Sequence, residues 1–170
     1  MEKISFRNNV LPLKNILYRL ALRITQSEED AKDIVKDTLL KVWDKKDEWN
    51  EIESIEAFSL TICRNLALDR IKKQDANNES LENTVIQDIS RELSPLEETL
   101  QRDRVELVKR IINALPEKQR SCMQLRDIEG KQYKEIAEVL QITEEQVKVN
   151  IFRARKTVKE RFIKLDDYGL

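Results

Sequence analysis

The sequence predicts an all-α protein, made of two small helical domains joined by a flexible acidic linker. Three observations carry this prediction. The 170 residues include only 2 Gly and 3 Pro, too few for the many tight turns of a β-rich or doubly wound fold. Charged residues make up 37% of the chain and apolar residues 40%, which suits surface helices around a modest core. Residues 76–100 hold six acidic residues and one basic residue, between two stretches of mixed charge.

The uneven charge also predicts the domain boundaries. We expect an N-terminal domain over residues 1–75, a linker over 76–99, and a C-terminal domain, ending in a helix-turn-helix, over 100–170. The linker has weak apolar periodicity and several Asn and Ser residues, as a tether between domains does. A surface helix that runs backwards from Leu96 is the alternative interpretation of this segment.

The N-terminal domain is predicted to hold three helices. The first has apolar residues at helical spacing from Val10 to Ile24. Thr25-Gln26-Ser27 interrupts it, and Ser27 is the expected N-cap of a second helix, because the acidic residues that follow it favour a helix start. Ser54 is expected to cap a third helix.

The C-terminal domain is predicted to open with a helix whose apolar stripe begins at Val105 and ends at Leu115. Pro116 suits the first position of the next helix, and Gly130 suits its end. Two short helical units follow, over residues 133–140 and from residue 147, with a three-residue turn between them. Two short helices joined by such a turn are the helix-turn-helix pattern.

The last helix has a defined start, a buried face and a cationic face. Thr143 and Gln146 form a capping box. Spacing places Val147, Ile151 and Ala154 on one face. Residues 147–164 include seven basic residues and one acidic residue, a charge that favours contact with a polyanion. The combination indicates a recognition helix for the major groove of duplex DNA. A solvated basic face on a C-terminal helix is the alternative interpretation.

Several function classes are excluded by composition. The chain has no His, so it has no histidine acid–base pair and no His-ligated metal. Cys63 and Cys122 are far apart in sequence and form no metal or redox motif. We expect no enzyme activity, no cofactor, no metal and no small-molecule substrate. The chain has no apolar run long enough for a membrane span and no signal-peptide core, so we expect a cytoplasmic protein without membrane insertion.

The chain resembles the extracytoplasmic-function (ECF) RNA polymerase sigma factors. In the C-terminal domain, the patterns ALPxxxR, EGxxYxEIAxxL and VKxxxxRAR occur in order between Ala114 and Arg155. This part is similar to sigma domain four. The first domain is similar to sigma domain two, with AxDIVxDTxLKVW over residues 31–43 and IxRNxAxDxxKK over residues 62–73. The resemblance covers nearly the whole chain.

The resemblance implies a bacterial initiation factor that binds core RNA polymerase and directs promoter-specific transcription initiation. Domain four would bind the duplex at the minus-thirty-five element and touch the polymerase β flap. The residues expected to approach bases or the groove wall are Lys148, Val149, Asn150, Phe152 and Arg153. Those expected at phosphates or against the DNA backbone are Arg155, Lys156, Tyr133 and Lys134.

Domain two would have two tasks. It would grip the coiled coil of the β′ subunit through Asp33, Asp37, Leu40 and Lys41. It would also hold the opened minus-ten strand and capture an extruded base. The residues expected there are Trp49, Asn50, Arg64, Asn65, Arg70, Lys72 and Lys73. A core role for Trp49 is equally compatible with the sequence.

Two other functions are compatible with parts of the sequence. A one-component helix-turn-helix regulator explains the second domain but not the match in the first. A helical adaptor would use its basic helix to bind an acidic protein. The family resemblance also implies an anti-sigma partner, although no residue identifies it. Gln141 stands where the family often has a turn Gly, and a left-handed backbone there would cost Gln about 1 kcal/mol.

Overall fold

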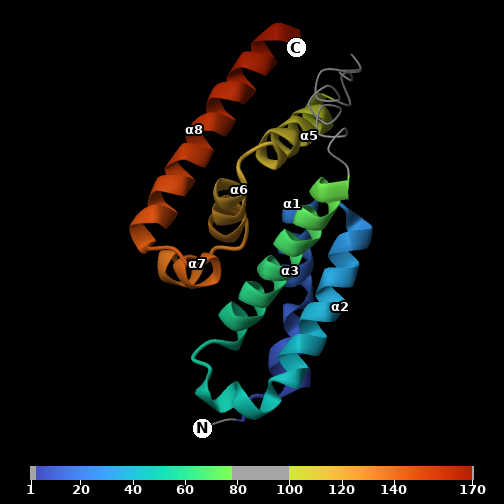
Figure 1. Cartoon of the computed structure of the whole chain (residues 1–170). Coiled ribbons are helices and arrows are strands. Elements are labelled where there is room, and N and C mark those ends of the chain that lie inside the picture. The colour runs from blue at the N-terminus through green and yellow to red at the C-terminus, as the bar shows by residue number, and fades with distance from the viewer. Residues whose placement is uncertain (1–2, 78–99, 170) are drawn as a thin grey trace.

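The computed structural model describes residues 3–77 and 100–169, and all regular structure in these ranges is helical. The all-α prediction is confirmed. Figure 1 shows the helices in chain order, coloured from blue to red. The predicted linker over 76–99, with its alternative helix behind Leu96, lies outside the described residues from position 78 onwards.

The N-terminal lobe, residues 3–77, is a bundle of three helices. These are α1 (Lys14–Thr25), α2 (Glu28–Asp44) and α3 (Ile55–Asn77), and each packs against the other two (Figure 1). Two short turns, Phe6–Val10 and Leu11–Leu13, precede α1, and a 3₁₀ turn, Lys46–Glu51, joins α2 to α3. Helix α3 extends two residues beyond the expected domain end at 75.

The expected helix starts in this lobe are confirmed. The Ser27 hydroxyl accepts a hydrogen bond from the Asp30 amide at 3.2 Å, and the Ser54 hydroxyl accepts one from the Ala57 amide at 3.1 Å. Gln26 ends α1 in the left-handed conformation, with φ of 58°. Each cap satisfies an amide that has no partner within its helix, which explains where these helices begin.

The C-terminal lobe, residues 100–169, contains the predicted helix-turn-helix. Its helices are α5 (Leu100–Asn113), α6 (Glu117–Met123), α7 (Tyr133–Leu140) and α8 (Glu144–Gly169), and a π-helical turn, Gln124–Ile128, continues α6. Pro116 is the N-cap of α6, one position before the expected one. Gly130 follows this segment with φ of 71°, the left-handed conformation that favours glycine.

The start of α8 is a complete capping box. The Thr143 hydroxyl accepts from the Gln146 amide at 3.1 Å, and the Gln146 side-chain oxygen accepts from the Thr143 amide at 2.9 Å. Gln141 adopts the left-handed conformation, with φ of 57° and ψ of 46°. The turn therefore keeps the geometry of a glycine turn although its residue is Gln.

The predicted buried stripe of α8 is also confirmed. Val147, Ile151 and Ala154 are each at most 2% exposed. Ala154 packs with residues of α5 around Ile112, which holds α5 along α8. Val105, expected in the α5 stripe, is 55% exposed.

The two lobes pack against each other. One buried apolar cluster includes Leu17 and Leu60 of the N-terminal lobe together with Leu125, Ile136 and Val139 of the C-terminal lobe. Helix α7 contacts α3, and α6 contacts α1. Helix α8 lies on the side of the molecule away from α2 (Figure 1). Among the described helices, none combines the length and apolar character needed to cross a membrane.

Candidate nucleic-acid and protein interfaces

The outer face of α8 presents apolar and cationic side chains side by side. Phe152 is 67% exposed and Val149 is 43% exposed, opposite the buried stripe. Lys148, Arg153 and Lys156 are exposed on the same helix. Exposed apolar groups can contact thymine methyl groups, and cations beside them can contact phosphates or guanine. The helix thus provides both kinds of contact that a major-groove reader needs.

Other residues predicted to contact DNA have partners within the lobe. Two cations lie near the Tyr133 ring, with the Arg126 guanidinium 4.4 Å and the Lys148 ammonium 5.7 Å from its centroid. The Asn150 amide nitrogen donates to the Gln146 carbonyl at 2.7 Å. Lys134, at the start of α7, is exposed. The contact between Lys148 and Tyr133 joins the start of α8 to the start of α7, whereas the Asn150 hydrogen bond lies within α8.

Arg155 is held by an ion pair in the turn after α6. Its guanidinium donates two hydrogen bonds to the Asp127 carboxylate, one of them at 3.1 Å. This hydrogen bonding raises the pKa of Arg155 above its ordinary value. The predicted role of Arg155 at phosphates would require it to leave Asp127 or to bind while paired.

The four residues predicted to bind polymerase all lie on α2 and are exposed. They are Asp33, Asp37, Leu40 and Lys41. Leu40 is 61% exposed, and Trp43, one turn further on, is 44% exposed. Exposed apolar side chains among charged ones are typical of a protein interface with a polar rim.

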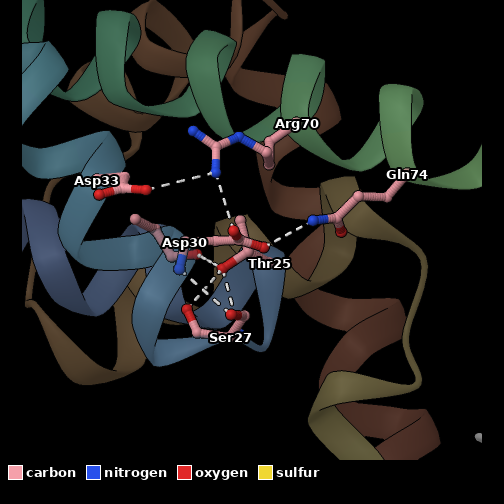
Figure 2. Close-up of polar contacts among 7 residues, drawn as sticks. Thr25, Ser27, Asp30, Asp33, Arg70 and Gln74 are labelled. Atoms are coloured by element: carbon pink, nitrogen blue, oxygen red, sulfur yellow. Dashed lines mark hydrogen bonds and ion pairs between the residues drawn. The ribbon is translucent and has the colours of Figure 1, made fainter.

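In the N-terminal lobe, an arginine predicted to contact DNA lies close to an aspartate predicted to contact polymerase. Figure 2 shows Arg70 of α3 directed towards α2, where its Nη1 lies 2.9 Å from Asp30 and 3.9 Å from Asp33. Gln74 donates to the other Asp30 oxygen at 2.8 Å. Arg70, predicted to contact DNA, is therefore linked to Asp33, predicted to contact polymerase.

Trp49 belongs to the core of the N-terminal lobe. It is 6% exposed and packs with Val10 and Val42, and its indole nitrogen donates to the Val42 carbonyl at 2.9 Å. This placement supports the core alternative for Trp49 that the sequence left open. Asn50, the next residue, is exposed.

Packing of the two lobes buries one of the α3 residues predicted to contact DNA and leaves others exposed. Asn65, Lys72 and Lys73 are exposed. Arg64 is 7% exposed and donates two hydrogen bonds to the Glu117 carboxylate of α6, at 2.8 and 2.9 Å. The structure therefore brings Arg64 against the C-terminal lobe and leaves its neighbours on α3 accessible.

Glu117 is a partner that sequence reasoning missed. Burial opposes its ionisation, but hydrogen bonds from Arg64 and Ser121 and the charges of Arg64 and Arg120 outweigh this effect and lower its pKa. The ALPxxxR motif contains Glu117, yet nothing in the motif indicates a contact with another lobe.

The buried thiols offer no reactive group. Burial is the main reason why the pKa of Cys63 and of Cys122 is raised to about 12. A protonated thiol is a poor nucleophile and metal ligand. Within the described ranges, no group of three or more His, Cys, Asp or Glu side chains is placed to hold a metal ion.

Two family models match the chain. Residues 10–77 match sigma-70 region 2, and residues 106–158 match sigma-70 region 4. The first match spans the three-helix bundle and the second spans the helix-turn-helix. Together they account for most of the chain, in the order expected of a sigma factor.

Curated relatives and a solved structure agree with these matches. The chain is 25% identical over 161 residues to a probable RNA polymerase sigma factor, RfaY, of Xanthomonas campestris pv. campestris, covering 93% of this chain and 40% of that protein. It is 24% identical over 168 residues to the ECF RNA polymerase sigma factor SigW of Bacillus subtilis, covering 94% of this chain and 90% of that protein.

The fold is similar to that of the sigma factor RpoE of Bartonella quintana, solved in complex with the anti-sigma factor NepR. The TM-score is 0.71 at 24% identity, over 95% of this chain and 98% of that chain. The chain belongs to the ECF family of RNA polymerase sigma factors.

Proposed function

We propose that this chain binds core RNA polymerase and directs it to promoters by contacting two DNA elements, performing no chemical step itself. In this proposal residues 1–75 and 100–170 act as sigma domains two and four. The observation that carries it is the exposed face of α8, because a capped helix that buries Val147 and Ile151 presents Lys148, Phe152 and Arg153 outwards. Family membership supports the polymerase as the partner.

The C-terminal lobe is proposed to bind the minus-thirty-five duplex through α8 and to contact the β flap. Lys148 and Arg153 would supply cationic contacts, and the exposed side chains of Val149 and Phe152 would lie against base edges or the groove wall. Helix α7, joined to α8 by the turn at Gln141, would support the reading helix against the DNA backbone.

The N-terminal lobe is proposed to bind the β′ coiled coil through α2 and the opened minus-ten strand through α3 and the preceding turn. Asp37 and Leu40 are exposed on α2, as a protein interface requires. On α3, Asn65, Lys72 and Lys73 are accessible to a strand. We also propose a cytoplasmic location with the polymerase, and an anti-sigma partner of the kind found with the Bartonella protein.

Two charge reversals test the two tasks separately. Lys148→Glu combined with Arg153→Glu is expected to abolish promoter-specific run-off transcription while core polymerase is still bound, because both residues lie on the outer face of α8. Asp37→Lys is expected to weaken polymerase binding and leave the affinity of the chain for duplex DNA unchanged.

Each of the two measurements has a result that would contradict the proposed assignment of residues. Loss of polymerase binding in the α8 variant would show that the faces are assigned wrongly. Unchanged affinity of Asp37→Lys for core polymerase would remove Asp37 from that interface. Specific binding of the chain to promoter duplex without polymerase, together with no binding to polymerase, would favour a one-component regulator instead.

A further inference from the structure

A groove with a volume of about 440 Å³ lies between α1 and α2 on the N-terminal lobe. Most of its lining is apolar and comes from Val35 and Leu39 of α2, Tyr18 of α1 and Leu11 of the turn before α1. Val35 is 4% exposed, whereas Leu11 is 42% exposed. Val35 therefore belongs to the buried floor of the groove, and Leu11 belongs to its open edge.

Three lysines also line this groove, Lys14 on α1 and Lys32 and Lys36 on α2. All three are exposed, and Lys32 and Lys36 are one helical turn apart on the same side of α2. None of the described residues that line the groove is acidic, and none of these lysines forms an ion pair within residues 3–77 and 100–169. The groove therefore combines an apolar interior with a positive rim that no carboxylate of these ranges neutralises.

This combination suits a small molecule with a hydrocarbon body and an anionic head. Ligand sites usually have volumes of about 300–1,000 Å³, with apolar walls and a few polar groups that fix orientation, and this groove lies within that range. Lysine stems pack along apolar surface while their ammonium groups remain in water, where they attract an anion. From Lys32 to Leu39 the α2 wall is about 10 Å long, which suits an extended acyl chain of medium length.

We propose that the groove between α1 and α2 binds a free fatty-acid anion, with its carboxylate at the lysines and its acyl chain against Tyr18, Val35 and Leu39. The groove holds one molecule and changes no bond in it. None of the residues assigned above to polymerase or DNA lines the groove, so the proposal does not depend on the proposed function.

Calorimetric titration of the full-length chain with hexanoate, octanoate and decanoate tests the proposal. Each buried methylene should raise the affinity about fourfold, and one molecule should bind per chain. Octanol has the chain of octanoate without its charge, and it should bind about tenfold more weakly because it loses the attraction of the lysines. Octylammonium, which has the opposite charge, should bind more weakly still.

Variants place the binding in the groove. Lys32→Gln combined with Lys36→Gln should weaken decanoate binding about fivefold or more, because two exposed charges are lost from the rim. Lys159→Gln combined with Lys164→Gln is the matched control, since it removes the same charge from exposed positions on α8 that do not line the groove, and it should leave the affinity unchanged. Leu11→Asp places a negative charge at the exposed edge of the groove and should also weaken binding.

Several results would overturn the proposal. These are an absence of saturable decanoate binding, an affinity that does not depend on chain length or charge, and equal losses in the two double-lysine variants when circular dichroism shows both to be folded. Vesicles of phosphatidylglycerol present acyl anions as a surface instead of single molecules. A chain that bound these vesicles but not free decanoate would have a membrane-binding face there, which would also contradict the proposal.

Discussion

Replacement of Trp49 distinguishes the core role of this side chain from a role at the DNA strand. Trp49→Ala removes a ring that is 6% exposed, its contacts with Val10 and Val42, and its hydrogen bond to the Val42 carbonyl. Truncation of a buried aromatic typically costs about 3–5 kcal/mol. The indole hydrogen bond accounts for about 1 kcal/mol of a loss of this kind.

Trp43 is the matched control. It packs edge-on against Trp49, with ring centroids 6.2 Å apart, but it is 44% exposed. Since nearly half of its surface is already in water, we expect Trp43→Ala to cost about 2 kcal/mol. Urea unfolding followed by circular dichroism measures both values. A loss below about 1 kcal/mol for Trp49→Ala, or a loss no larger than that of Trp43→Ala, would refute the core role.

Three further predictions concern local conformation and ionisation. Gln141→Gly should stabilise the chain by about 1 kcal/mol in thermal or urea unfolding, because φ is 57° there; a destabilised variant would contradict this. Cys63 and Cys122 should resist a thiol reagent at mildly alkaline pH until the protein unfolds, because burial raises the pKa of each to about 12; rapid labelling of the folded chain would show otherwise. Glu117 has a lowered pKa in the fold, so its contribution is complete above its unfolded pKa of about 4.5 and is lost as the pH falls through the lower folded value. The wild type should therefore lose more stability than Glu117→Gln below that pH, and equal losses would count against the ion pair.

Local features of the fold were predictable because they depend on neighbouring residues. Ser27 and Ser54 as caps, the capping box at Thr143 and the buried stripe from Val147 follow from hydrogen-bonding capacity and helical spacing alone. The left-handed turn at Gln141 shows that tertiary packing of α7 against α8 outweighs the preference of one residue.

Contacts between the lobes were not predictable in the same way. The charge of Arg64 and its place in a sigma-like motif suggested DNA, whereas its partner in the structure is Glu117, 53 positions further along the chain. Similarly, Trp49 had two interpretations of equal weight until the position of Val42 relative to it was known. Periodicity shows that a face is apolar or charged, but it does not show which distant segment covers that face.

The most direct test of the account is run-off transcription with core RNA polymerase and the purified chain on a pool of genomic promoter fragments. The account predicts that the chain co-elutes with polymerase and that defined transcripts arise from a subset of fragments only when it is present. A chain that neither binds the polymerase nor changes which fragments are transcribed would contradict the account at its centre.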